Sequence, residues 1–178
     1  SYDSYKKALK NAKLIIKLTG CDAVKLESNN KNFHIIEKLV KKNIPVMGHI
    51  GFTPQFKEKF KIEGNTLGKA NKLLKEALSI QNAGAFSIVL ECISPKAAKL
   101  ITSKLKIPTI GIGSSSYCDG QILVTDDMLG ISGFYPKFVK KYANLDRTIE
   151  KAVKKYTREV KLNKFPTVKN FLNGTKRR

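Results

Sequence analysis

Two spacings of apolar residues alternate along the chain. Apolar residues that recur every three or four positions, as on one face of an amphipathic helix, alternate with short apolar runs of strand length. The helical spacing predicts helices near residues 5–19, 33–42, 68–83 and 94–105, and a last helix that carries Ile149, Ala152, Val153, Tyr156 and Val160. The apolar runs predict strands at residues 23–27, 44–50, 86–91, 107–113 and 121–124.

Local signals fix two of the predicted helix boundaries. Gly20 follows the first helix, and glycine is the usual residue just beyond a helix end. Ser94 and Pro95 open the fourth helix, because a serine oxygen can accept from the free N–H groups of the first turn and proline suits the first helical position. We therefore expect the first helix to end before Gly20 and the fourth to begin at Pro95.

Helices separate most successive strands, which predicts an α/β fold with a parallel sheet. The chain also repeats itself. Residues 20–27 resemble residues 84–91, 64 positions later, and residues 44–48 resemble residues 107–111 at an offset of 63. Repeated strand and helix units favour the (β/α)8 TIM barrel, which needs eight strands.

Five predicted strands are fewer than a closed barrel needs. We expect the chain to supply about the last five strands of a (β/α)8 TIM barrel and their helices, with the first three strands on another piece of chain or lost. Residues 1–165 are predicted to form the C-terminal portion of a single barrel domain, and residues 166–178 a basic C-terminal tail.

Composition describes one domain with a hydrophobic core: the chain has 178 residues, of which 42% are hydrophobic. No apolar run approaches the roughly 18–20 residues that span a bilayer, and the first ten residues lack a signal-peptide pattern, so we expect a cytoplasmic protein without a membrane partner. Cys21, Cys92 and Cys118 are odd in number and far apart. They are predicted to be free thiols.

The formal net charge of +20 is the strongest compositional signal, and such a charge is typical of nucleic-acid-binding proteins. Two observations oppose this interpretation. Only Arg147, Arg158, Arg177 and Arg178 are arginines, whereas nucleic-acid sites favour the guanidinium group, and the lysines are spread along the chain. We expect a solvated surface without a nucleic-acid partner. Steeply salt-dependent binding to random DNA would support the opposite view.

Candidate chemistry lies at the ends of three strands, where barrel enzymes place their active sites. Lys25 and Glu27 are two residues apart, so their side chains point to the same face. A carboxylate there can hold Mg²⁺, and an ammonium can bind an anionic substrate. A structural Lys–Glu ion pair explains the same spacing equally well.

Glu91 ends an otherwise apolar strand, and a buried carboxylate is costly unless it is paired. It is a candidate general base, with a contact to the helix that begins after Ser94 as the alternative. His49 ends its strand between glycines and is a candidate donor to a substrate oxygen. A purely structural role for His49 is the alternative.

A series of phrases resembles one known family in the same order. These phrases are Asp-Ala-Val-Lys-Leu-Glu at 22–27, Ile-Pro-Val-Met-Gly-His-Ile-Gly-Phe-Thr-Pro-Gln at 44–55, Ile-Val-Leu-Glu at 88–91, Ile-Pro-Thr-Ile-Gly-Ile-Gly at 107–113, Asp-Gly-Gln-Ile-Leu-Val at 119–124 and Pro-Lys-Phe at 136–138. Over nearly its whole length the chain is similar to ketopantoate hydroxymethyltransferases.

This resemblance implies an activity and a set of roles. The family transfers a hydroxymethyl group from 5,10-methylenetetrahydrofolate to 3-methyl-2-oxobutanoate, giving 2-dehydropantoate for pantothenate biosynthesis through a Mg²⁺-stabilised enolate. By motif position, Glu91 matches the proton acceptor, Lys25 the keto-acid binder, Glu27 the acidic residue at the Mg²⁺, and His49 a substrate-binding histidine. The family's two magnesium-binding aspartates lie upstream of the matched region. A homo-oligomer, a decamer in the family, is expected.

Two other interpretations stay open at this point. A related barrel enzyme of the phosphoenolpyruvate mutase or isocitrate lyase type would share the Mg²⁺-enolate chemistry without folate. An inactive, truncated barrel fragment would keep the sequence phrases without the activity.

Overall fold

The computed structural model describes residues 2–28 and 32–171. These residues form two compact units, divided after Ile122. The domain boundary predicted after residue 165 stays a prediction, and residues 172–178 of the predicted basic tail lie outside the described residues.

The first unit is built on a five-stranded sheet. Its strands are β1 (Val24–Glu27), β2 (Val46–Gly51), β3 (Ser87–Glu91), β4 (Thr109–Ile112) and β5 (Gly120–Gln121). They lie side by side in chain order, and every neighbouring pair is parallel. The predicted α/β fold with a parallel sheet is confirmed, and the arrangement is consistent with part of a TIM barrel.

The last strand is shorter than the sequence predicts. It spans Gly120–Gln121 rather than 121–124. The N–H of Ile122 still donates to the carbonyl of Gly111, at 3.0 Å, but the chain then leaves the sheet. Ile122 and Val124 are both 53% exposed, so the apolar run at residues 122–124 is not a buried strand.

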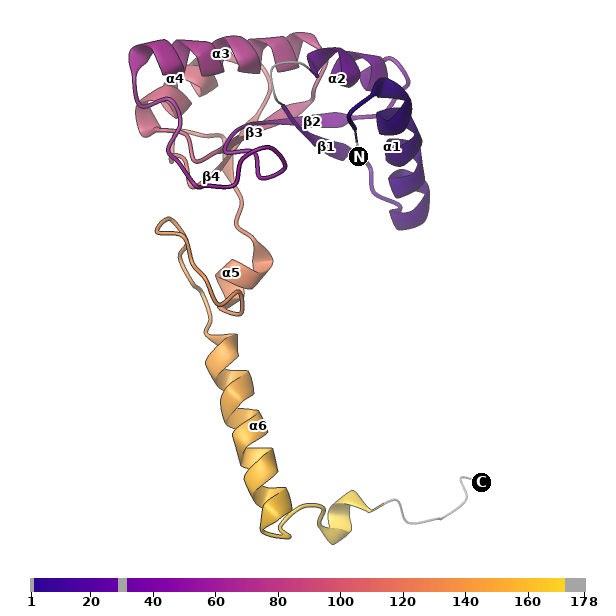
Figure 1. The fold of residues 1–178 in the computed structure, drawn as a ribbon, viewed down its shortest axis with the longest axis vertical. Helices are drawn as coiled ribbons and strands as arrows, with labels where there is room; N and C mark the ends of the chain where they lie inside the picture. The colour runs from indigo at the N-terminus through magenta and orange to yellow at the C-terminus, as the bar shows by residue number, and fades with distance from the viewer. Residues whose placement is uncertain (1, 29–31, 172–178) are drawn as a thin grey trace. The chain divides into compact units, whose positions relative to one another are not determined.

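Three helices lie over one face of the sheet, and a fourth, α1, stands beside its β1 edge (Figure 1). The four helices are α1 (Tyr5–Thr19), α2 (Phe33–Val40), α3 (Leu67–Asn82) and α4 (Pro95–Lys104). Both predicted helix boundaries are confirmed. Gly20 adopts a left-handed conformation, with φ of 69°, and donates its N–H to the carbonyl of Ile16. The Oγ of Ser94 accepts from the N–H of Ala97 at 3.4 Å and donates to the carbonyl of Gly64 at 2.6 Å.

The hydrophobic core lies between the sheet and these helices. Its largest fully buried side chains come from both layers: Ile36, Leu39, Val46, Ile50, Ile80, Ile88, Leu90 and Ile101. Gly48 lets α3 approach β2 closely, because a Cβ at this position would lie 2.4 Å from Cγ2 of Ile80. Since side chains alternate along a strand, the opposite face of the sheet carries Lys25, Glu27, His49 and Glu91.

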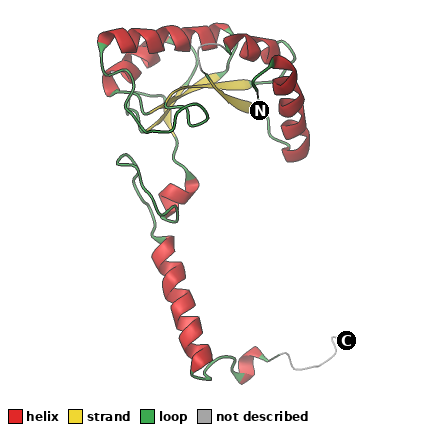
Figure 2. Ribbon diagram, viewed as in Figure 1, coloured by secondary structure: helices red, strands yellow, loops and turns green. Residues whose placement is uncertain are grey.

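The second unit contains α5 (Thr125–Leu129), α6 (Leu145–Lys161) and the short 3₁₀-helix η1 (Val168–Asn170), coloured as helix in Figure 2. The predicted last helix is confirmed as α6, but none of its residues is buried. α5 and η1 are too short to produce a periodic signal. In the described residues no helix has both the length and the apolarity needed to cross a membrane.

Candidate active site

Three predicted site residues meet at the carboxyl ends of β1, β2 and β3. Glu27 is the last residue of β1 and pairs in register with His49 of β2. Glu91 is the last residue of β3 and pairs in register with Gly51, two residues beyond His49. The parallel register therefore places the two carboxylates on the strands that flank the histidine, on the face that the helices leave uncovered.

His49 lies between the two carboxylates. Its Nε2 is 3.1 Å from Oε2 of Glu91, and its Nδ1 is 3.9 Å from Oε1 of Glu27. The histidine side chain is fully buried, and the side chains of Glu27 and Glu91 are only 5% and 13% exposed. Neither ring nitrogen makes an aligned hydrogen bond with the described residues. Because buried polar atoms are normally satisfied, this imidazole has hydrogen-bonding capacity left for a substrate oxygen.

Glu27 is held in place by the connections that follow β1 and β2. Its Oε2 accepts from the backbone N–H of Gln55 at 2.9 Å. Its carbonyl accepts from the side-chain amide of the buried Asn32 at 2.8 Å, and the N–H of Ser28 donates to the carbonyl of His49 at 2.8 Å. These bonds fix the end of β1 against the end of β2.

Tyr2 is a further neighbour of Glu27. Burial, and then the negative charge of Glu27, raise the pKa of Tyr2 to about 12, so its hydroxyl stays protonated at neutral pH. Sequence reasoning missed Tyr2 and Asn32, which carry no motif signal. Gln55, by contrast, belongs to a phrase that resembles the family, and only its contact with Glu27 was not predicted.

The carboxylate of Glu91 points to His49 rather than to the start of α4. Ser94 caps that helix instead, so the predicted alternative contact is not found. The next residue, Cys92, is buried with φ of 52°. Burial and the nearby Glu91 charge raise the pKa of the Cys92 thiol to about 11. The thiolate is the reactive form, so a raised pKa disfavours a nucleophilic role for Cys92 at neutral pH.

Lys25 lies on the same strand face as Glu27 but is exposed. Within the described residues it forms no ion pair with Glu27, so the structural Lys–Glu pair is not found there. Lys25 borders a cavity of about 200 Å³ that Tyr2 and Gln55 also line. Its ammonium group is therefore available to an anionic ligand in this cavity.

The described residues contain no cluster of three or more His, Cys, Asp or Glu side chains arranged for a metal ion. Glu27 nevertheless fits one part of a Mg²⁺ site, since Mg²⁺ is commonly held by one or two carboxylates together with water and substrate oxygens. The carboxylate of Glu27 can supply one such ligand, directly or through water.

The fold and the site together define a class of protein. A parallel α/β sheet of barrel type, with a buried histidine between two carboxylates at the carboxyl ends of its strands, is typical of an enzyme that moves protons in a substrate.

Comparison with known proteins identifies the family. A sequence profile described as ketopantoate hydroxymethyltransferase matches residues 1–168, and the chain belongs to this family. It is similar to proteins named 3-methyl-2-oxobutanoate hydroxymethyltransferase in three organisms. The Pelagibacter ubique protein is 46% identical over 170 residues, covering 96% of this chain and 66% of the relative. The Anaplasma marginale (strain Florida) protein is 50% identical over 169 residues (93% and 61%), and the Trichodesmium erythraeum protein is 49% identical over 168 residues (92% and 64%).

The chain thus spans between 61 and 66% of the length of these three relatives. The match confirms the resemblance on which the sequence-based roles rest. Phosphoenolpyruvate mutases and isocitrate lyases, the predicted alternative, are not the family that the profile identifies.

Proposed function

We propose that this chain carries the acid–base centre of a 3-methyl-2-oxobutanoate hydroxymethyltransferase. The proposed reaction transfers a hydroxymethyl group from 5,10-methylenetetrahydrofolate to 3-methyl-2-oxobutanoate and gives 2-dehydropantoate. The observation that carries this proposal is the position of buried His49 between Glu27 and Glu91, in a chain that belongs to this family.

Glu91 is the proposed general base. In the reaction a proton must leave C3 of the keto acid, next to the ketone, before this carbon can form a bond to the one-carbon unit. A carboxylate that lies in a largely buried site at the end of β3 can accept this proton. Nε2 of His49 lies 3.1 Å from Oε2 of Glu91, so the histidine borders the proposed base.

Lys25 and His49 are the proposed substrate-binding residues. The ammonium group of Lys25 is exposed on the same face as the carboxylates and can pair with the carboxylate of the keto acid. The ring nitrogens of His49 lack aligned partners in the described residues and can hydrogen-bond to the keto oxygen. Donors aimed at that oxygen stabilise the negative charge that develops there when C3 loses its proton.

Glu27 is the proposed ligand for Mg²⁺, with the other ligands from water, substrate oxygens or protein outside these residues. When bound, Mg²⁺ supplies positive charge that polarises the keto group. The hydrogen bond from Gln55 to Oε2 orients the Glu27 carboxylate for this task. Over the whole reaction one water is consumed, and its oxygen becomes the hydroxyl group of the product.

Substitution of Glu91 tests the proposal. We expect Glu91→Gln to slow deuterium exchange at C3 of 3-methyl-2-oxobutanoate by at least about 100-fold, the lower end of general-base contributions. The matched control is Glu37→Gln on α2, whose side chain is 49% exposed and paired with Lys41. It should exchange at the unsubstituted rate. If Glu91→Gln exchanges deuterium as fast as the unsubstituted protein, Glu91 is not the general base.

The unsubstituted protein decides between activity and the predicted inactive fragment. If it catalyses neither exchange nor folate-dependent transfer in the presence of Mg²⁺, the proposed function of this chain is wrong. A cytoplasmic location and a homo-oligomer, decameric as in the family, stay predictions. Light scattering after size-exclusion chromatography measures the oligomeric state directly.

A further inference from the structure

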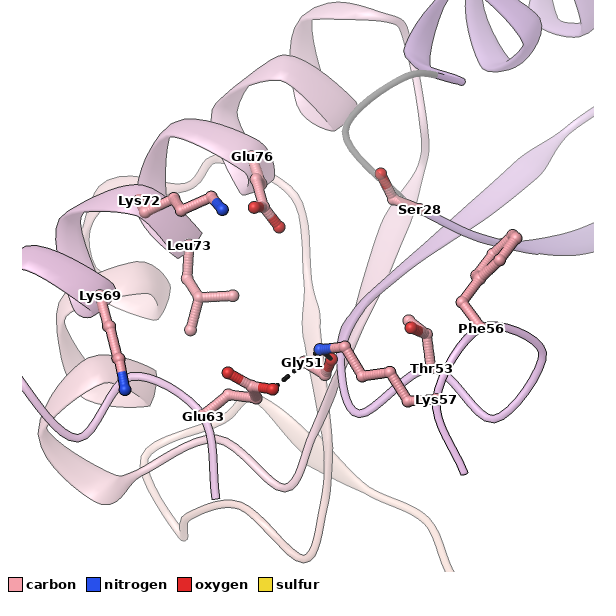
Figure 3. A pocket seen from close by; sticks show the side chains of 10 residues that line it. All are labelled: Ser28, Gly51, Thr53, Phe56, Lys57, Glu63, Lys69, Lys72, Leu73 and Glu76. Atoms are coloured by element: carbon pink, nitrogen blue, oxygen red, sulfur yellow. Dashed lines mark hydrogen bonds and ion pairs between the residues drawn. The ribbon is translucent and has the colours of Figure 1, made fainter. Parts of the chain in front are cut away.

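The side chain of Lys57 joins separate parts of the chain near the acid–base centre. Its Nζ donates to the backbone carbonyl of Gly51 at 2.7 Å and lies 2.8 Å from Oε1 of Glu63. All three residues help to line a cavity of about 360 Å³, and Figure 3 shows the lysine side chain extended toward both partners. Gly51 is the last residue of β2, so this ammonium group bonds to a buried carbonyl at the strand end.

Glu63 is a fixed partner for Lys57. Its backbone N–H donates to the carbonyl of Cys92, and its carbonyl accepts from the N–H of Ser94, both at 2.8 Å. These two bonds attach Glu63 to the connection that follows Glu91, the last residue of β3. Through Glu63, Lys57 therefore ties the connection after β2 to the strand end that carries the proposed general base.

The backbone before Lys57 forms a short turn that holds Glu27. The N–H of Lys57 donates to the carbonyl of Thr53 at 2.9 Å, and inside the turn the N–H of Gln55 donates to Oε2 of Glu27 at 2.9 Å. Contacts of the Lys57 side chain fix the end of this turn, and its start follows directly from β2. Because Gln55 lies two positions from either end, the direction of its N–H depends on both.

The neighbouring lysines differ from Lys57. Lys59 and Lys61 belong to the same connection and are exposed, and in the part of the chain that the structure describes neither forms an ion pair. The side chains of Lys57 and Glu63 are 41% and 26% exposed, and ion pairs that water reaches contribute little to stability. Substitution of Lys57 should therefore leave the protein folded, and its contacts serve to orient the connection.

We propose that Lys57 is a positioning residue for the reaction. It holds the turn after β2 against the ends of β2 and β3, keeps the N–H of Gln55 on Glu27, and so fixes the Glu27 carboxylate relative to Glu91. This inference rests on the proposed function, which assigns complementary roles to the two carboxylates. A residue that orients a carboxylate without touching the substrate should affect kcat more than KM.

Backbone amide exchange, measured by mass spectrometry, tests the contact without any need for catalysis. Lys57→Met keeps most of the side-chain length and removes the ammonium group. We expect the amides of residues 53–57 to exchange at least about threefold faster in this variant, a factor within the range that partly exposed ion pairs contribute. Lys59→Met is the matched control and should exchange as the unsubstituted protein does. Lys57→Arg keeps a positive charge and N–H donors, so it should restore slow exchange.

Deuterium exchange at C3 of the keto acid measures the effect on the reaction. We expect Lys57→Met to lower kcat at least about threefold, less than the roughly 10–100-fold typical of groups that bond directly to a metal ligand, because Lys57 acts through Gln55. KM for the keto acid should stay at the unsubstituted value, and Lys57→Arg should recover kcat. Circular dichroism verifies that each variant is folded.

The two measurements separate this proposal from the proposed function. If the keto acid exchanges deuterium but Lys57→Met matches Lys59→Met in kcat or in amide exchange, the role of Lys57 is wrong and the proposed function stands. An effect confined to KM would assign Lys57 to substrate binding and also overturns the proposal. If the unsubstituted protein exchanges no deuterium at C3, the proposed function is wrong, and faster amide exchange in Lys57→Met still supports the contact that holds the turn.

Discussion

Gly51 is the last residue of β2. Near the proposed site, it is the position where an added methyl group should lower the stability of the fold most. Its φ is 98°, a conformation that residues with a Cβ rarely adopt. A Cβ built here would lie 2.1 Å from the carbonyl oxygen of Glu91 and 2.8 Å from Cγ1 of Ile93. The nearest atom belongs to the backbone and cannot rotate away, so Gly51→Ala must push β2 and β3 apart.

Two terms set the magnitude. The unfavourable φ costs about 1–3 kcal/mol. The carbonyl of Glu91 also accepts from the N–H of Phe52 at 2.8 Å, and losing this bond while the groups stay buried costs about 1–3 kcal/mol more. We therefore expect Gly51→Ala to lower the free energy of unfolding by about 2–6 kcal/mol, a large part of the 5–15 kcal/mol typical of a domain.

Urea unfolding followed by circular dichroism measures this change. Gly68→Ala in the first turn of α3 is the matched control, because its Cβ meets no heavy atom within 4 Å and its φ is not in the left-handed range. It should be neutral or stabilising by up to about 1 kcal/mol, since alanine is the better helix former. In Gly51→Ala the displaced backbone of Glu91 should also slow deuterium exchange of the keto acid, because displacements of about 1 Å can cost 100-fold in rate. If the free energy of unfolding of Gly51→Ala lies within about 0.5 kcal/mol of that of the unsubstituted protein, the account of this strand end is wrong.

Three smaller predictions concern the surroundings of the site. Ser94→Ala should lower the free energy of unfolding by about 1 kcal/mol in urea titrations, because α4 loses its N-cap. Hydrogen bonds from the N–H and then the hydroxyl of Thr109 lower the pKa of Asp119 below its ordinary value of 3.8. The ionised carboxylate of Asp119 therefore stabilises the fold above pH 3.8, and this stabilisation is lost as the pH falls through the lowered pKa of the folded protein. The difference in unfolding free energy between the unsubstituted protein and Asp119→Asn should therefore shrink as the pH is lowered through 3.8 and below. The thiol of Cys92, buried and with its pKa raised to about 11, should react with Ellman's reagent at pH 8 more slowly than the partly exposed Cys21, as single serine variants would show.

The local pattern of the sequence predicted the elements of the first unit because that pattern depends on near neighbours. The apolar spacing and the signals at Gly20 and Ser94 are properties of a few adjacent residues, and the structure places those helix ends as expected. The unpredicted contacts join residues far apart in the chain. Tyr2 approaches Glu27 only through the packing of the N-terminal segment, and the register of β1 on β2 alone brings Glu27 level with His49.

The sequence did not predict the short elements correctly, for a different reason. β5 contributes two residues, and α5 spans the five residues Thr125–Leu129, so neither is long enough to contain two periods of the pattern on which the predictions depend. The amphipathic spacing of α6 was predicted correctly, but spacing identifies an apolar face without identifying what covers it.

The internal repeat explains why two identical side chains can take different roles. Glu27 and Glu91 occupy equivalent positions in the two copies, so they end the strands on either side of β2. The repeat fails at the residue between them, because His49 corresponds at the offset of 63 to Ile112, a buried apolar residue of β4. A single histidine therefore faces two carboxylates whose surroundings differ. Glu27 receives the N–H of Gln55, whereas Glu91 lies closer to the ring and is more exposed. Different surroundings of this kind are what the two proposed roles require, in which Glu27 holds an ion and Glu91 exchanges a proton.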